Sequence, residues 1–156
     1  MMSINVIDRV VEWLPGERAE AYQNITMSNI IFDTHFPLKP VWPGMLSIMA
    51  MQRLAEGVLA SQDDYATTYY MTELGNVKWR SYVKPGDCMT VKVELAKKAG
   101  TEAELIYFKG NIQVAGKTVV TVGRMSFAAV KATADIQQQQ MRAYWQQRGV
   151  KQVVKL

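Results

Sequence analysis

Hydrophobic and polar residues alternate near the start of the chain and through its second half, whereas the middle carries one continuous apolar segment. Residues 4–24 contain two alternating stretches on either side of Pro15-Gly16, a pair typical of tight turns, so they predict a β-hairpin. Prolines recur through residues 25–44 and exclude a helix interior, which predicts a stiff loop. Residues 45–60 are good helix formers and apolar on nearly every face, a pattern that predicts a buried helix.

The second half of the chain has a period of two and is rich in β-branched and aromatic residues. A hairpin, one buried helix and a run of strands leave no room for alternating β-α-β units. We therefore predict the α+β class, with a curved antiparallel sheet wrapped round a central helix. Turn-forming residues divide the second half into four predicted strands of an antiparallel meander, over residues 67–83, 88–99, 103–115 and 117–130.

The end of the chain is polar and forms a separate segment. We divide the protein into a main domain over residues 1–130 and a C-terminal tail over residues 131–156. Asp135 could cap a helix that ends near Arg148. A partial apolar face on this helix predicts that the tail docks on the domain.

Composition and charge exclude several classes of protein. The 156 residues suit one domain, and no apolar stretch approaches the ~20 residues that span a bilayer, so we expect no membrane span. The charged N-terminal stretch does not resemble a signal peptide, which favours the cytoplasm. A single cysteine, Cys88, and a single histidine leave no internal disulfide and no zinc site, and we expect Cys88 to be half-buried. The net charge of +4 fits an acidic partner, but the basic residues are too scattered to indicate nucleic-acid binding.

The candidate chemistry lies where the proline-rich loop meets the buried helix. The loop carries His35, and the predicted helix follows Pro43-Gly44, so its unpaired N–H groups point back toward the loop. An imidazole facing such amides could remove a proton from a carbon whose neighbouring carbonyl gains negative charge. A lone histidine in a proline-rich loop also fits a purely structural role.

The segment HFPLKPVWPGML, residues 35–46, resembles the active-site motif of the 3-hydroxyacyl-acyl carrier protein dehydratases (FabZ/FabA-like proteins). The resemblance extends over residues 4–130 and implies the hotdog fold, usually as dimers. It also implies the loss of water from a 3-hydroxyacyl thioester, without a cofactor, on the phosphopantetheine arm of an acyl carrier protein. By this resemblance, His35 would take the C2 proton, the Val41 carbonyl would orient the imidazole, and the Gly44 amide would bind the thioester oxygen.

The sequence departs from the family on the helix. The family places a carboxylate fourteen residues after the histidine, where it protonates the departing hydroxyl, and this chain has Met49 there. A thioether cannot donate a proton. Asp33 or Glu56 could replace the acid, a sister hotdog subunit could supply it, or a homodimer could perform weak elimination, isomerisation or carrier binding alone.

Other residues are candidates for binding the acyl chain and its carrier. Phe32, Trp42 and Met45 are expected to line an acyl channel, and Lys78, Arg80, Lys84 and Arg124 to contact the acidic carrier. The leading hypothesis is a dehydratase of a fatty-acid-like or polyketide/polyene-like pathway. The alternatives are a non-catalytic hotdog subunit that binds a carrier or a catalytic partner, and a hotdog thioesterase.

Overall fold

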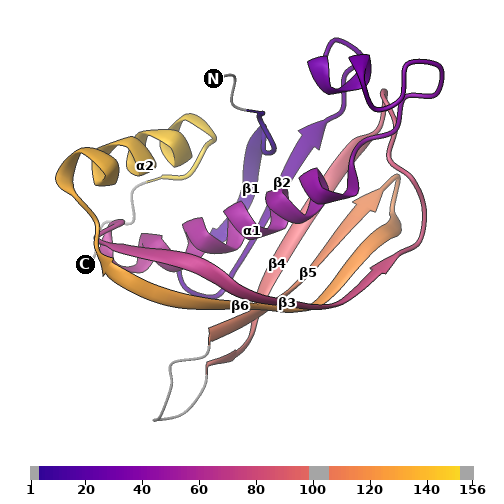
Figure 1. Ribbon diagram of the computed structural model, residues 1–156. Coiled ribbons are helices and arrows are strands. Elements are labelled where there is room, and N and C mark those ends of the chain that lie inside the picture. Colours follow the sequence, from indigo (N-terminus) through magenta and orange to yellow (C-terminus); the bar gives the residue numbers. More distant parts are fainter. Residues whose placement is uncertain (1–3, 99–105, 152–156) are drawn as a thin grey trace.

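The computed structural model describes residues 4–98 and 106–151 and shows one antiparallel sheet that curves round a long helix (Figure 1). This is the α+β architecture that the hydrophobic pattern predicts. Two 3-10 turns, η1 (Ile30–Asp33) and η2 (Ser61–Asp63), flank the long helix. The remaining elements are β1 (Arg9–Leu14), β2 (Arg18–Asn24), α1 (Gly44–Ala60), β3 (Thr67–Trp79), β4 (Cys88–Lys98), β5 (Ile106–Val114), β6 (Lys117–Ala132) and α2 (Asp135–Gln147).

The strand order is β1-β2-β4-β5-β6-β3, so the predicted meander is wrong at one step. Strands β4, β5 and β6 do pair in sequence order, but β3 pairs with β6 and leaves β4 beside β2. Alternation identifies a strand without identifying its neighbour. The connection over residues 80–87 is longer than a hairpin turn, and it carries the chain from one edge of the sheet to its middle.

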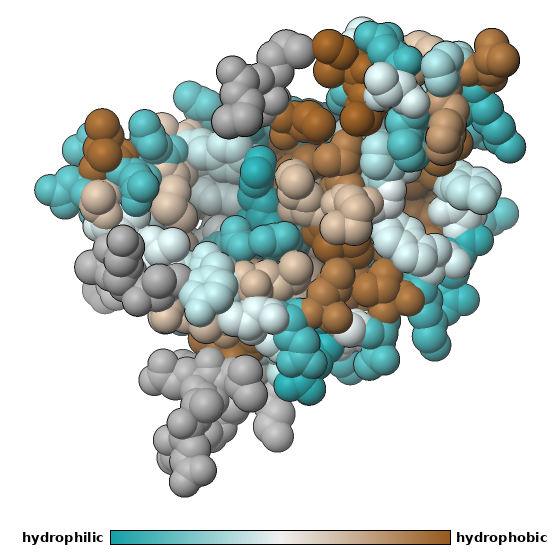
Figure 2. All heavy atoms as spheres, in the orientation of Figure 1, coloured by the Kyte–Doolittle hydropathy of each residue, from teal (hydrophilic) through white to brown (hydrophobic). Residues whose placement is uncertain are grey.

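Helix α1 lies in the hollow of the sheet because its inward residues are apolar. Met51, Leu54 and Val58 are fully buried and belong to the same core as Phe108 and other sheet residues. Burying each such side chain contributes about 1.5–3 kcal/mol relative to exposure. The opposite face of the helix is less covered, and Figure 2 shows a band of hydrophobic surface over α1 and toward β3.

Cys88 is exposed, which contradicts the expectation of a half-buried thiol. Successive side chains on a strand point to opposite faces of the sheet. Met89 faces the core and is fully buried, so its neighbour Cys88 points outward.

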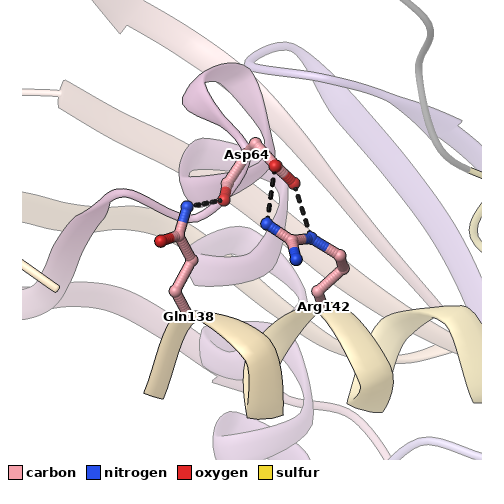
Figure 3. A network of polar contacts seen from close by, with 3 residues as sticks. All are labelled: Asp64, Gln138 and Arg142. Atoms are coloured by element: carbon pink, nitrogen blue, oxygen red, sulfur yellow. Dashed lines mark hydrogen bonds and ion pairs between the residues drawn. The ribbon is translucent and has the colours of Figure 1, made fainter. Parts of the chain in front are cut away.

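Helix α2 packs against the C-terminal half of α1 through Trp145, which is 3% exposed. The indole lies 4.9 Å from the ring of Trp13, centroid to centroid, and directly over Gly57. Two polar residues of α2 also hold the turn after α1, as Figure 3 shows. Arg142 binds both carboxylate oxygens of Asp64, at 3.0 and 2.6 Å, and Gln138 donates to the Asp64 carbonyl at 2.8 Å.

The predicted cap of this helix is one residue off. Ala134 occupies the N-cap position, and Asp135 is the first helical residue. The acidic side chain therefore lies in the first turn, where it interacts favourably with the positive end of the helix dipole.

Gly57 and Trp145 allow a test of how α2 docks. A Cβ on Gly57 would lie 2.4 Å from the indole, so Gly57→Ala should lower the free energy of unfolding by about 1–3 kcal/mol. In a Trp145→Ala background the same change should raise it by up to about 1 kcal/mol, because alanine favours a helix over glycine. Urea unfolding measures both effects. The same sign in both backgrounds would contradict this packing.

Candidate functional site

His35 is held by the loop that precedes α1. Its backbone N–H donates to Ile31 at 3.0 Å, and its carbonyl accepts from the Val41 N–H at 3.2 Å. The loop is then tied to the segment between β3 and β4, because the Trp42 N–H donates to the Val83 carbonyl at 2.7 Å. The His35–Phe36 peptide bond is cis. Residues on both sides of the histidine are thus fixed by backbone hydrogen bonds.

The imidazole of His35 makes one short hydrogen bond, from Nδ1 to the Val41 carbonyl at 2.6 Å. A carbonyl oxygen can only accept, so Nδ1 carries the hydrogen. In the neutral ring Nε2 then has a free lone pair, as a general base requires. The Phe36 ring stacks on the imidazole at 4.4 Å between centroids.

The first residue of α1 is Gly44, and the chain enters the helix in an extended conformation at Pro43. The Leu46 N–H donates to the Pro43 carbonyl at 3.0 Å, whereas the Gly44 N–H has no backbone partner among the described residues. The ring of Trp79 covers Gly44 so closely that a Cβ there would lie 2.6 Å from the indole. Glycine therefore leaves room for the indole, and its N–H is one of the unpaired amides at the helix tip.

One cavity of about 660 Å³ joins these groups. Its inner wall includes the buried residues Trp42, Ser47, Val83 and Val120. His35 and Gly44 line it together, and exposed residues such as Tyr82 form its mouth. The imidazole is accordingly reachable from solvent and lies in the same cavity as the helix tip.

The structure brings several of the predicted residues together in this cavity and leaves others outside it. Val41, Trp42 and Gly44 line it with His35. Phe32 is 3% exposed and packs behind Trp42, with ring centroids 6.0 Å apart, and Met45 is 68% exposed on α1. Neither Phe32 nor Met45 is among the residues that line the cavity.

The two carboxylates considered as replacement acids do not line the cavity either. Asp33 is exposed at the end of η1. Glu56 lies about 18 Å along α1 from Gly44, at about 1.5 Å per residue. Its side chain accepts from Gln52 at 3.1 Å, and burial raises its pKa against the opposing effects of Gln52 and Arg53. Met49 lies on the outer face of α1 and is 38% exposed.

Of the four cations predicted to bind the carrier, some lie near the cavity and others lie away from it. Arg80 lines the mouth of the cavity, and Lys84 lines a neighbouring groove that also contains Lys39. Lys78 is exposed on β3. Arg124 is engaged elsewhere, since its guanidinium lies 4.7 Å from the Tyr107 ring and its Nε donates to Ser126 at 3.2 Å.

The cavity-lining residues that sequence reasoning missed include Lys39, Ser47, Trp79 and Tyr82. Lys39 lies inside the quoted motif, so its position could have been noticed. Trp79 ends β3, and Tyr82 lies in the segment that crosses from β3 to β4, so their proximity depends on the strand order. Ser47 follows Gly44 by three residues and therefore shares its helix face.

Comparison with known proteins identifies the family. The FabA-like domain family matches residues 1–123. The chain belongs to this family. A FabA-like relative, the 3-hydroxyacyl-acyl-carrier-protein dehydratase FabZ of Bacillus subtilis, is 32% identical over 124 residues, which cover 79% of this chain and 85% of the relative. The FabZ of Clostridium novyi is 38% identical over 96 residues, 61% of this chain and 68% of the relative.

Solved structures confirm the hotdog fold of this FabA-like chain. The dehydratase heterocomplex ApeI:P from Xenorhabdus doucetiae matches with a TM-score of 0.60 at 17% identity, covering 75% of this chain and 92% of the other. A hypothetical thioesterase with coenzyme A from Streptococcus pneumoniae matches with a TM-score of 0.58 at 9% identity, covering 81% and 88%.

Residues 4–98 and 106–151 contain no group of three histidine, cysteine, aspartate or glutamate side chains that could hold a metal ion. Within the same ranges no helix is long and apolar enough to cross a membrane.

The raised pKa of Glu56 predicts how stability depends on pH. The folded state binds the Glu56 proton more tightly than the unfolded state, so this residue makes the protein less stable as the pH rises from below the ordinary glutamate pKa of 4.5 to above the raised pKa. Glu56→Gln should therefore raise the free energy of unfolding at neutral pH and change it little in acid. Urea titrations across this range test this, with Glu17→Gln as a control for the loss of one exposed charge. Equal effects at both ends of the range would contradict it.

Proposed function

We propose that this protein removes water from a 3-hydroxyacyl thioester carried by an acyl carrier protein and leaves a trans-2-enoyl thioester. The observation that carries the proposal is the hydrogen bond from His35 Nδ1 to Val41, which frees Nε2 in the cavity that also holds the Gly44 amide. The FabZ relatives, named for this reaction, support it. The reaction belongs to fatty-acid-like or polyketide-like chain elongation in the cytoplasm.

The residues of the cavity suit the first half of this elimination. The Gly44 amide and the positive end of α1 stabilise the thioester oxygen as it gains charge, which makes the C2 hydrogen more acidic. His35 Nε2 takes that proton. The C2 electron pair forms the double bond to C3, the C3–O bond breaks, and the oxygen leaves as water once it gains a proton. Beyond the phosphopantetheine arm of the substrate, no cofactor takes part.

The proton for the departing oxygen comes, in this proposal, from a second hotdog subunit. Met49 cannot donate one, and neither Asp33 nor Glu56 lines the cavity. Strand β3 lies at an open edge of the sheet, and Met45 and Met49 are exposed on the neighbouring helix face. The hydrophobic band of Figure 2 covers this region. A second copy of the same chain would bring a second Met49, so a different subunit with a helix carboxylate suits the chemistry better. The structural neighbour ApeI:P is a heterocomplex of dehydratases.

The carrier is proposed to dock around the cavity mouth. Arg80 is exposed there, and Lys39 and Lys84 lie in the adjoining groove with Leu38 and Tyr82. An acidic carrier surface would be attracted by these cations, and the exposed apolar side chains would add contact area.

His35→Ala tests the reaction directly. The chain is incubated with a 3-hydroxyacyl carrier, and mass spectrometry of the carrier arm follows the loss of one water. We expect the variant to dehydrate about 10²–10⁴-fold more slowly than the wild type, because it lacks the base. Lys117→Ala, an exposed change in the β5–β6 turn, should leave the rate unchanged. Release of the free acid would instead indicate a thioesterase, and a substrate that stays unaltered even with Met49→Glu, which restores a carboxyl on the helix, a binding subunit.

Met49→Glu tests whether the acid is missing. In dimers of this chain alone, the new carboxyl should accelerate dehydration up to about 10²-fold, since it supplies the proton for the departing hydroxyl. Met49→Gln has a similar size without an acidic proton and should leave the rate near that of the wild type. If Met49→Glu formed dimers, as measured by size-exclusion chromatography, and still matched the wild type, the proposal that this chain lacks the acid at position 49 would be wrong.

A further inference from the structure

Ser47 carries a buried hydroxyl group in the cavity, and the reaction described above does not use this hydroxyl. Ser47 is 2% exposed and lines the cavity together with His35 and Gly44. Its hydroxyl partner is the sulfur of Met89, at 3.8 Å. A thioether is a weak acceptor, so this hydroxyl is poorly satisfied.

Two other buried polar side chains of the described chain each have at least one stronger partner, although Gln23 Oε1 and the cavity-lining Trp42 Nε1 have none. Gln23 donates to the Asn5 carbonyl at 2.6 Å, and the Ser126 hydroxyl accepts from Arg124 at 3.2 Å. A buried hydroxyl without a good partner destabilises a fold relative to an apolar side chain. Serine at position 47 is therefore unfavourable for packing, and the cost is explained if a ligand supplies the missing acceptor.

The position of Ser47 on α1 indicates which ligand atom it would meet. It follows Gly44 by three residues, so it lies on the same face about 4.5 Å further along the helix axis. In a 3-hydroxyacyl thioester, a single carbon atom, C2, separates the carbonyl carbon from the carbon that bears the hydroxyl. With the carbonyl oxygen at Gly44, the C3 oxygen falls within reach of the next helical turn.

We infer that the Ser47 hydroxyl donates a hydrogen bond to the C3 oxygen of the substrate, an inference that rests on the proposed function. Ser47 keeps its own proton, and the proton that completes water comes from the partner's acid. Two fixed oxygens, at C1 and C3, orient the C2 hydrogen toward His35. The pair also selects one configuration at C3, because the mirror-image hydroxyl would point away from Ser47.

A binding experiment tests this without relying on turnover. In a His35→Ala background, which cannot consume the ligand, dissociation constants are measured for a 3-hydroxyhexanoyl carrier and for a hexanoyl carrier without the hydroxyl. We expect about tenfold preference for the hydroxylated ligand, the usual worth of one hydrogen bond. Adding Ser47→Ala should abolish that preference, whereas adding Ser126→Ala, at a buried serine of β6, should retain it.

The outcomes separate this inference from the proposed function. A tenfold preference that survives Ser47→Ala would overturn the role of Ser47, even if the wild type dehydrates its substrate. A preference that disappears in Ser47→Ala would support the role, even if the wild type proved unable to dehydrate. Thermal unfolding gives a second readout, since Ser47→Ala should keep or raise the midpoint. A clear drop in the midpoint, with ligand preference retained, would show that the serine is structural and overturn the inference.

Discussion

The hydrogen bond between His35 Nδ1 and the Val41 carbonyl is the constraint on which the site depends. It selects the tautomer of the ring and fixes its orientation, and it exists because the loop returns on itself through the Val41 N–H and the His35 carbonyl. The loop is anchored in turn by the bond from Trp42 to Val83, on the segment that leads into β4. The position of one ring therefore depends on how the sheet is connected.

The same connectivity explains what the fold leaves open. Helix α1 fills the hollow of the sheet with its inward face, while its tip lies next to the crossing segment between β3 and β4. The His35 imidazole and the Gly44 amide line one cavity at that end of the helix. Among residues 4–98 and 106–151, none pairs with the outer edge of β3, Met45 and Met49 stay exposed on the outer helix face, and α2 contacts the far end of α1 through Trp145. The surface proposed for a second subunit is thus close to the site but does not block its mouth.

Much of this arrangement could be predicted from the sequence, and the errors have physical causes. Periodicity identified the buried helix and the strands, and the motif around His35 identified an imidazole, a carbonyl that binds it and a helix tip that line one cavity. The strand order was missed because alternation does not reveal which strands pair. Trp79 and Tyr82 were missed for the same reason, since the crossing segment brings them to the cavity. Phe32 was expected in the channel but packs behind Trp42, a distinction that composition cannot make.

The most direct measurement is the ¹⁵N NMR spectrum of the untagged protein labelled at histidine, recorded at a pH where the imidazole is neutral. His35 is the single histidine of the sequence, so its two ring nitrogens give two unambiguous signals. The hydrogen bond to Val41 predicts a protonated Nδ1 and an unprotonated Nε2 with an available lone pair. A protonated Nε2, or rapid averaging of the two tautomers, would contradict the claim that this ring is held ready to accept a proton in the cavity.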